Sequence, residues 1–316
     1  MGKLFRSGIM TEGVAFSWPL LAHGAAGRLA DRGVLALTGS DARTFLQGLI
    51  TNDVRRVSPS HAIYALFLTA QGKFLHELFV TAQVDADGDE TLLIETEAAR
   101  APDLLRRLSM YKLRSKVTLA DASARWAVGV ALDGAAAGAA PGAAGIMETP
   151  EGPAIAYVDP RHAGLGLRLL LPRPVAESLP DAADAYARRR LDLGVPDGSR
   201  DLVPEKSIPL ENGMDNLSAV AFDKGCYMGQ ELTARTHYRA LIRKRLMRVT
   251  ATDGQALPAA GTPVLWGERE VGEMRSSLGP LGLAVLRIED VEKPDVALSC
   301  GGVPLTVSGP VPAPRP

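Results

Sequence analysis

The chain has 316 residues, of which 46% are hydrophobic and 22% are charged, and its formal net charge is −1. A chain of this length buries a core large enough to fold without disulfide or metal cross-links. Its balanced charge excludes a global electrostatic attraction to nucleic acid or anionic lipid. Two cysteines, Cys226 and Cys300, exclude a disulfide framework and favour a reducing compartment. We therefore expect a cytoplasmic protein, with the mitochondrial matrix as the alternative only for a eukaryotic source.

No segment predicts export or membrane insertion. The N-terminal residues lack the continuous apolar run of a signal peptide, because Arg6 and Thr11 interrupt it. The most apolar long stretch, 126–147, is broken by Asp133 and is rich in Ala and Gly, which are too weakly hydrophobic to span a bilayer. We therefore expect no membrane among the partners of this protein, and no direct contact with nucleic acid.

The first half of the chain alternates between helical and strand periods, which indicates α+β domains with an antiparallel sheet. Ser40 is a candidate N-cap for the first helix, and Gln71-Gly72 joins two apolar runs as in a β-hairpin. The elements expected here are a helix between 41 and 50, strands at 63–70, 74–84 and 91–95, a helix through 104–111, and strands near 116–119 and 127–132.

The second half begins with an Ala/Gly stretch at 134–145, which we predict to be a flexible surface loop because such residues cannot pack a core. Beyond residue 243 short apolar runs at turn spacing predict a small antiparallel barrel. The elements expected are strands at 154–158 and 165–171, a helical stretch at 175–193, and barrel strands at 245–250, 263–266, 270–275, 282–288 and 303–307. We predict a body at 1–240 with two α+β subdomains, and a barrel at 241–316 with a Pro-rich tail.

The segment 224–231, which reads Lys-Gly-Cys-Tyr-Met-Gly-Gln-Glu, combines several chemically useful residues. Gly225 and Gly229 allow sharp turns, or close approach of the backbone to a ligand, around Cys226. A plainer interpretation is that Cys226 is a buried structural cysteine in a tight loop, as free cysteines often are. The residue types alone leave both interpretations open.

Charged and polar residues surround this cysteine in the sequence. Positive charge from Lys224, Arg235 or His237 would lower the pKa of the thiol and raise its thiolate fraction. Gln230 and Glu231 stand where a helix can begin, so they can instead satisfy its first backbone N–H groups.

The same segment, continued by Ala234-Arg235, resembles the hallmark of the YgfZ family. These are folate-binding proteins related to the glycine-cleavage T-protein and to a mitochondrial iron–sulfur assembly factor, and the continuation 232–246 resembles the mitochondrial branch most. Further blocks resemble the same superfamily in the expected order. They are Phe45-Leu46-Gln47-Gly48, Thr51-Asn52-Asp53-Val54, Gln71-Gly72-Lys73, Tyr111 with 113–117, Asp159-Pro160-Arg161, 165–168, 190–196 and 204–211.

The resemblance implies a fold, a ligand and a set of site residues. The fold would be α+β, a T-protein-like ring of antiparallel-sheet domains with a small C-terminal β-barrel, and a central cavity would hold tetrahydrofolate or a related folate. The motif residues expected to carry function are Cys226, Lys224, Gln230, Glu231 and Arg235. The residues expected to contact folate are Asp192, Glu77, Asn52, Tyr227, Gly225 and Gly229.

Two positions depart from the family pattern. Where the aminomethyltransferases carry an aspartate near the reactive nitrogen of folate, this sequence has His76 and Glu77. The departure argues against aminomethyl transfer, because catalytic geometry tolerates little displacement. Both residues can equally be ordinary strand residues on opposite faces. Asp192 stands where the family has a glutamate that hydrogen-bonds the pterin, and its carboxylate can still accept N–H donors.

From the resemblance we interpret the chain as a tetrahydrofolate-binding protein that supports the assembly or repair of iron–sulfur proteins through Cys226. Its expected partners are iron–sulfur client or carrier proteins. The five histidines show no pair at metal-ligand spacing and no CxxC occurs, so we expect no resident metal site. One alternative is a folate-dependent aminomethyl- or methyltransferase that uses Glu77 as an acid. Another is a folate-binding scaffold in which the motif only shapes a loop.

Overall fold

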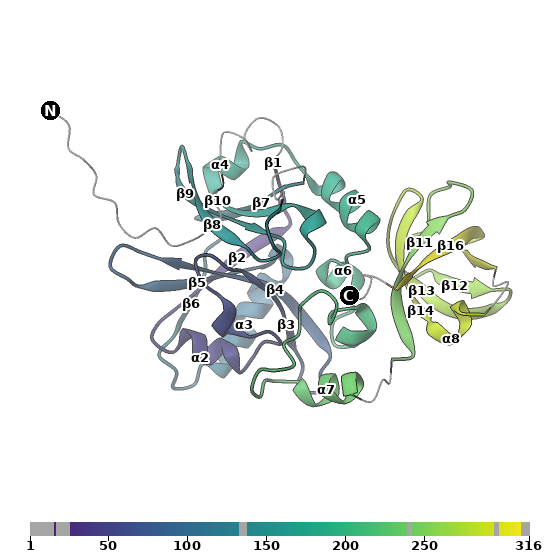
Figure 1. Cartoon of the computed structure of the whole chain (residues 1–316), viewed down its shortest axis with the longest axis horizontal. Coiled ribbons are helices and arrows are strands. Elements are labelled where there is room, and N and C mark those ends of the chain that lie inside the picture. The colour runs from purple at the N-terminus through teal and green to yellow at the C-terminus, as the bar shows by residue number, and fades with distance from the viewer. Residues whose placement is uncertain (1–15, 17–25, 133–137, 239–241, 294–296, 311–316) are drawn as a thin grey trace.

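The computed structural model describes residue 16 and residues 26–132, 138–238, 242–293 and 297–310. Two antiparallel five-stranded sheets form the body of the molecule, and a closed six-stranded barrel lies beside them (Figure 1). The predicted fold class, α+β with a small C-terminal β-barrel, is confirmed. The division at residue 240 stays a prediction, because residues 239–241 lie outside the described part.

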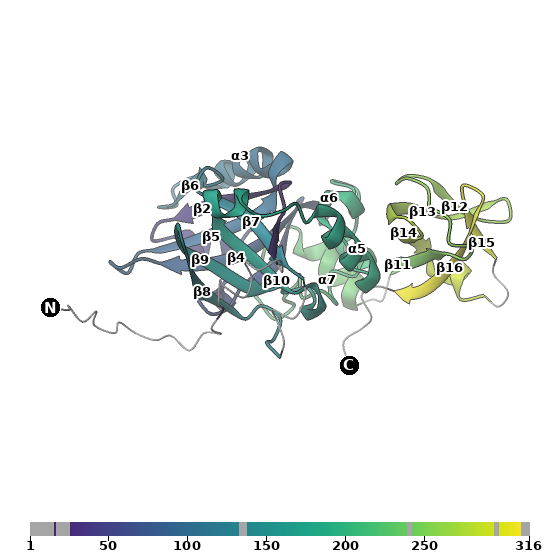
Figure 2. The same cartoon turned by 90° about the horizontal axis from the view of Figure 1, so that it is seen from above.

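The first sheet has the strand order β3-β4-β5-β2-β6. Its strands are β2 (Arg32–Thr38), β3 (Ile63–Leu68), β4 (Phe74–Val84), β5 (Glu90–Glu97) and β6 (Thr118–Asp121). Helices α2 (Ala42–Gln47) and α3 (Ala101–Tyr111) cover one face, where Leu35, Phe45 and Leu104 share a core. In Figure 2, α3 lies above this sheet. The predicted β3–β4 hairpin is confirmed.

The second sheet has the strand order β1-β7-β10-β9-β8. Its strands are β1 (Ala26–Arg28), β7 (Trp126–Ala131), β8 (Ala144–Thr149), β9 (Gly152–Val158) and β10 (Leu167–Pro172). Apolar residues of both sheets, among them Tyr64, Phe79, Val128 and Tyr157, share one core. The interior of the body therefore lies between the two sheets.

The Ala/Gly stretch at 134–145 corrects one expectation. Its residues 134–137 lie outside the described part, but Ala144 and Gly145 begin β8 and pair with β9. Ala144 is buried in the core between the sheets. A methyl group fits where two strands and a core approach closely, so the argument that this composition cannot pack was wrong at this end of the stretch.

The barrel has the strand order β11-β14-β13-β12-β15-β16. Its strands are β11 (Lys244–Ala251), β12 (Pro263–Trp266), β13 (Arg269–Leu278), β14 (Leu281–Arg287), β15 (Leu298–Cys300) and β16 (Val303–Pro310), with α8 (Ile288–Val291) after β14. The sequence missed β15, because three residues are too few to show a strand period. Gly309 and Pro310 belong to β16 and not to the expected tail, whose residues 311–316 lie outside the described part.

Four helices connect the sheets and the barrel: α4 (Arg173–Glu177), α5 (Ala183–Leu193), α6 (Gly198–Asp201) and α7 (Gln230–Tyr238). Short 3-10 turns lie at η1 (Val54–Arg56), η2 (Ala98–Arg100), η3 (Ala163–Leu165) and η4 (Pro209–Asn212). Leu191 of α5 packs against Leu246 and Leu283, so α5 joins the barrel to the body. The expected cap Ser40 is wrong, because Asp41 occupies the N-cap of α2.

Candidate functional site

The motif segment 222–229 is an irregular loop that rests on the C-terminal end of α2 and on the β3–β4 turn. The backbone N–H of Met228 donates to the Gly48 carbonyl at 3.0 Å. Gly229 has a φ of +81°, and a Cβ there would lie 2.5 Å from the carbonyl oxygen of Thr69. Only glycine fits such a left-handed backbone in so narrow a space. The loop is therefore held closely against the sheet at its second glycine.

The ammonium group of Lys224 is turned into the protein. Its Nζ donates to the backbone carbonyls of Gln47 (2.7 Å), Ile50 (2.7 Å) and Asn52 (2.8 Å). An ammonium has three N–H bonds, so all are used, and they satisfy carbonyls that the end of α2 leaves free. Burial lowers the pKa of Lys224 to about 8. The side chain therefore anchors the loop, and its action on the thiol stays a prediction.

Asn52 and Tyr227, two of the expected folate contacts, are buried and engaged by the chain itself. The Asn52 side-chain N–H groups donate to the carbonyls of Tyr64 and Ser218, both at 2.7 Å. The Asn52 side-chain oxygen accepts from the Asp53 N–H at 2.7 Å. Tyr227 packs in the core between the sheets, where burial raises its pKa to about 12. Tyr227 thus holds the loop in the core, and Asn52 joins β3 to the segment that precedes the loop.

Helix α7 carries the rest of the motif. Gln230 begins the helix, and Glu231 and Arg235 form an exposed ion pair at 3.5 Å. The His237 ring, in the last turn, stacks on Phe222 with ring centroids 3.9 Å apart. This stack ties the end of α7 to the start of the loop. Arg235 and His237 thus contact Glu231 and Phe222, and no described contact joins either of them to the thiol.

Cys226 is exposed at the outside of this loop. Within the described residues no hydrogen bond engages its thiol. Gly225 is exposed beside it, and a Cβ there would meet nothing within 4 Å, so close packing does not require this glycine. Cys300, by contrast, is buried in the barrel, where its thiol donates to the Thr262 carbonyl at 3.7 Å and burial raises its pKa. The structural-cysteine interpretation fits Cys300 and does not fit Cys226.

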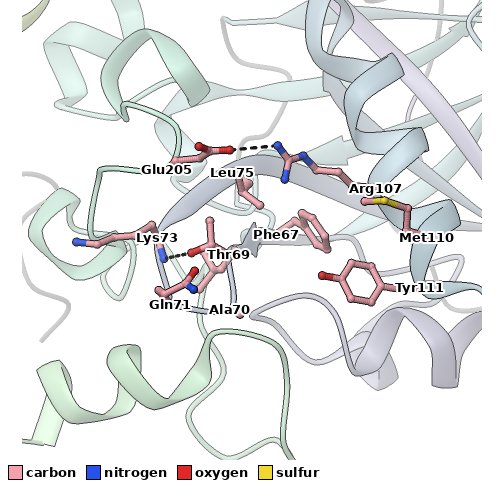
Figure 3. Close-up of a pocket in the computed structure, with 11 residues that line it drawn as sticks. Phe67, Thr69, Ala70, Gln71, Lys73, Leu75, Arg107, Met110, Tyr111 and Glu205 are labelled. Atoms are coloured by element: carbon pink, nitrogen blue, oxygen red, sulfur yellow. Dashed lines mark hydrogen bonds and ion pairs between the residues drawn. The ribbon is translucent and has the colours of Figure 1, made fainter.

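A hollow of about 590 Å³ lies beside the β3–β4 turn. We call it the turn hollow; its lining includes Thr69, Gln71, Lys73, Met110, Tyr111 and Glu205. Figure 3 shows the turn residues on one side and three α3 side chains, Arg107, Met110 and Tyr111, on the other. Because Gly229 packs on the same turn, the hollow and the cysteine loop share one structural element.

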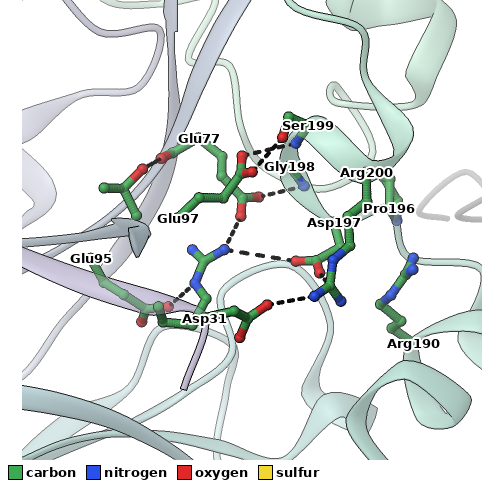
Figure 4. Close-up of polar contacts among 12 residues, drawn as sticks. Asp31, Glu77, Glu95, Glu97, Arg190, Pro196, Asp197, Gly198, Ser199 and Arg200 are labelled. Carbon is green, nitrogen blue, oxygen red and sulfur yellow. Dashed lines mark hydrogen bonds and ion pairs between the residues drawn. The ribbon is translucent and has the colours of Figure 1, made fainter. Parts of the chain in front are cut away.

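Glu77, the expected acid, is wholly buried between the two sheets. Arg32 Nη1 donates to its Oε1 at 2.5 Å. The Tyr64 hydroxyl (3.0 Å) and the Gly198 N–H (3.2 Å) donate to its Oε2, as Figure 4 shows for Gly198. Both carboxylate oxygens are therefore occupied by donors from the chain itself.

The charges next to Glu77 continue as a network that sequence reasoning missed. Arg32 also pairs with Glu95 at 2.9 Å, and Arg168 donates to both Glu95 and Asp159. Burial alone would raise the pKa of Glu95, but Arg168 and Arg32 hold it below its usual value. Charged residues inside otherwise apolar strands, such as Glu95 in β5 and Arg168 in β10, were the available signal.

His76 and Asp192 lie apart from this network. His76 Nε2 lies 3.0 Å from Asp103 Oδ2 under α3, and burial lowers the pKa of His76 to about 4, so its ring is neutral at pH 7. Asp192 is exposed on α5, where its backbone carbonyl accepts from Arg248 of the barrel. No described contact joins Asp192 to Glu77 or to the cysteine loop.

The residues expected to hold tetrahydrofolate do not fit it as they are arranged. Glu77 already accepts from three donors of the chain, Asn52 and Tyr227 are buried and engaged by the chain itself, and Asp192 lies on the surface. A pterin edge at Glu77 would have to displace Arg32. Breaking a buried ion pair by removing one partner costs about 3–5 kcal/mol. The centre that the resemblance assigns to folate is filled by the protein's own charged side chains.

The comparisons with known proteins agree with the motif. The human iron–sulfur cluster assembly factor IBA57, mitochondrial by its name, is 34% identical over 305 residues, covering 90% of this chain and 83% of its own. The homologue from Aspergillus fumigatus is 31% identical and covers 83% of this chain and 70% of its own. The chain belongs to the IBA57 family. A family profile described as the CAF17 C-terminal beta-barrel domain also matches residues 243–315.

The IBA57-family assignment confirms the resemblance to the mitochondrial assembly-factor branch. Among solved structures, the glycine cleavage system aminomethyltransferase T from Bartonella henselae aligns with a TM-score of 0.71. The alignment covers 92% of this chain and 87% of that chain at 15% identity, so it shows a shared fold alone. Among the described helices, none has the length and apolar content needed to cross a membrane.

Proposed function

We propose that this protein supports the assembly or repair of iron–sulfur proteins, and that Cys226 is the residue on which this function depends. The names of its relatives support the class of function. The observation that carries the residue assignment is the exposure of Cys226 on a loop whose neighbours, Lys224, Tyr227 and Gly229, are committed to holding it in place.

The chemistry of the cargo suits a single exposed thiol. Iron–sulfur clusters are held mainly by cysteine thiolates, and a thiol releases its proton when it binds iron. Among the described residues, no group of three His, Cys, Asp or Glu side chains is placed to hold a metal ion. Cys226 would then supply one thiolate to a cluster whose other ligands come from an iron–sulfur carrier or client protein. Because the loop is already anchored in the free protein, little further conformational entropy is lost when a partner docks.

The test is complementation of a strain that lacks this protein. Cys226→Ser should lower the activity of cluster-containing enzymes while the variant accumulates to the level of wild type, because the thiol is exposed and makes no hydrogen bond among the described residues. Cys300→Ser is the matched control and should support normal activity if it accumulates. Full enzyme activity with Cys226→Ser would overturn the assignment.

Tetrahydrofolate binding was implied by the resemblance, and the fold supports a folate-binding ancestry only at the level of shared architecture. Because Arg32 occupies Glu77, the proposed function includes no step that uses folate. Titration of wild type and Asp192→Ala with tetrahydrofolate tests this directly. We expect no saturable binding; binding by wild type that Asp192→Ala abolishes would restore folate to the account.

The alternative of an aminomethyl- or methyltransferase finds no support in the site. A general acid or base must reach the reacting group, whereas Glu77 is wholly buried and ion-paired. Formation of methylenetetrahydrofolate from an aminomethylated carrier protein, lost on Glu77→Gln but not on Cys226→Ser, would revive this alternative.

The proposed function also implies a cellular compartment for the protein. Both relatives are mitochondrial by name, which fits the matrix alternative for a eukaryotic source. For a bacterial source we propose the cytoplasm. The partners in either case would be iron–sulfur carriers and clients.

A further inference from the structure

Large apolar side chains gather at the C-terminal end of α3. In the segment Met110-Tyr111-Lys112-Leu113-Arg114, called the 110–114 segment below, Met110 is 56%, Tyr111 43% and Leu113 89% exposed. Among the described residues only three other large apolar side chains are exposed: Val84 and Ile146, which line a second hollow, and Tyr238 at the end of α7. A cluster of this kind on a protein surface marks an interaction site more often than single exposed residues do.

Leu113 is held in a conformation that does not suit it. Its φ is +42°, in the left-handed region that side chains with a Cβ avoid. Because Leu113 is exposed, its side chain gains nothing from burial that would offset the strain. Strained backbone of this kind persists where it has a use. The geometry presents the leucine outward as a contact residue.

The charges on the segment itself are of one sign. Lys112 and Arg114 alternate with the apolar residues, and Lys116 follows. Asp41 lies beside Leu113 and Arg114 and accepts from the Lys116 backbone N–H at 2.7 Å, but among the described residues no ion pair joins a carboxylate to the side chains of Lys112, Arg114 or Lys116. On the turn side, Lys73 likewise has no ion pair among the described residues. An apolar centre with a basic rim complements a protein surface that carries an apolar residue among carboxylates.

The 110–114 segment is continuous with the proposed cysteine site. Met110 and Tyr111 line the turn hollow on one side, and residues of the β3–β4 turn line it on the other (Figure 3). A Cβ on Gly72 in that turn would lie 2.8 Å from the carbonyl oxygen of Gly229. The β3–β4 turn therefore lines the hollow and also packs on Gly229, at the end of the loop that carries Cys226. A partner seated on the segment and the hollow would contact the turn on which that loop packs.

We infer that the 110–114 segment and the turn hollow form the docking surface for the protein that exchanges a cluster at Cys226, and that this partner presents an apolar side chain surrounded by Asp and Glu. The inference rests on the proposed function. We favour a protein over an anionic membrane, because a flat lipid surface would leave a hollow of about 590 Å³ unfilled and the proposed function supplies a protein partner. The apolar side chain enters the hollow, and the carboxylates face Lys112 and Arg114.

Leu113→Gly gives a sharp test, because it removes the contact and relieves the strain together. The probes are the purified iron–sulfur carrier proteins of the same organism, each with and without its cluster, and binding is measured at low and high salt. At least one carrier should bind wild type, and Leu113→Gly should weaken that binding at least tenfold while its denaturation midpoint stays equal or rises. A loss of binding cannot then be ascribed to unfolding.

Charge reversal and matched controls complete the design. Lys112→Glu with Arg114→Glu should weaken binding at least tenfold and flatten its salt dependence. Ile146→Thr and Arg188→Glu, exposed changes elsewhere on the surface, should leave binding within twofold. Cys226→Ser should weaken only the cluster-loaded form, so normal activity with Cys226→Ser would sink the proposed function while leaving the docking result to stand by itself.

Three outcomes would overturn the docking surface. The first is equal binding by wild type, Leu113→Gly and the charge-reversed variant. The second is the absence of binding by any carrier to wild type. The third is flotation of wild type with vesicles of anionic phospholipid that Leu113→Gly abolishes, which would assign the segment to a membrane surface.

Discussion

The cysteine loop and the buried centre around Glu77 both place a reactive residue type among cations, but they use those cations differently. At the centre, Arg32 and Arg168 pair with Glu77 and Glu95, and no side chain in these pairs is more than 3% exposed. At the loop, Lys224 binds backbone carbonyls and leaves the cysteine exposed. The centre therefore keeps its carboxylates buried and paired, whereas the loop is a support that presents one free thiol to solvent.

Breaking the centre should have the largest effect. Arg168→Met leaves Glu95 and Asp159 short of a partner, and we expect a loss of about 3–5 kcal/mol in the free energy of unfolding. Urea denaturation measures it, with the exposed Arg188→Met as the control. If Arg168→Met does not fold, adding Glu95→Gln should recover soluble protein, because it removes one of the buried negative charges that Arg168 balanced. A stability equal to wild type would show that the centre is not a stabilising network.

Removing the anchor of the loop should have the next largest effect. Lys224→Met keeps the length of the side chain but leaves three carbonyls without their donor. Unsatisfied buried groups cost about 1–3 kcal/mol each, and we expect a total loss of about 3 kcal/mol after relaxation. Denaturation and limited proteolysis within 222–229 check this. Unchanged stability with lost activity would return Lys224 to a direct chemical role.

The two glycines of the motif differ in how closely they are packed, so the same substitution should have different effects at the two positions. Gly229→Ala must strain a left-handed backbone and push against Thr69, so we expect a loss of about 1–3 kcal/mol. Gly225→Ala has open space around its Cβ and should change stability by less than about 0.5 kcal/mol. Equal losses, measured by thermal or urea denaturation, would contradict the packing of the loop on the turn.

A smaller effect is expected in acid. Burial raises the pKa of Asp197, but Arg190 and Arg32 outweigh it and lower the pKa to about 2. The unfolded chain therefore binds this proton more readily, so the contribution of Asp197 is complete above about pH 4 and is lost as the pH falls through about 2. Between pH 2 and 4, the slope of the unfolding free energy against pH reflects how many more protons the unfolded chain binds. Asp197→Asn should reduce this slope by up to the contribution of one bound proton. An unchanged slope would contradict the pairing.

The sequence predicted most of the architecture because hydrophobic periods are local. The β3–β4 hairpin, α3 and most barrel strands follow from such periods. The roles of individual polar residues depended on contacts between distant segments. Lys224 reads as an activator of its sequence neighbour Cys226, yet its partners lie at 47–52. Glu77 was expected to act as an acid because its partner Arg32 lies 45 residues away, so the sequence does not show that the two residues pair.

The dependence on contacts between distant segments also explains why some features of the motif could be predicted from the sequence and others could not. Gly229 could be predicted as a close approach, since glycine is favoured where backbones meet. The stack of His237 on Phe222 and the exposure of Cys226 could not be predicted, because both depend on how α7 returns over the loop. Charged residues within apolar strands, such as Glu95, are the pattern that would have revealed the buried network.

Selective alkylation of the exposed Cys226 thiol shows whether this thiol carries the function. Iodoacetamide should modify Cys226 in the folded protein and spare the buried Cys300, which mass spectrometry verifies. The alkylated and untreated proteins are then added to extracts of the deletion strain, and the recovery of cluster-containing enzyme activity is measured. The account predicts recovery with untreated protein and none with the protein alkylated at Cys226 alone; equal recovery with both would contradict it.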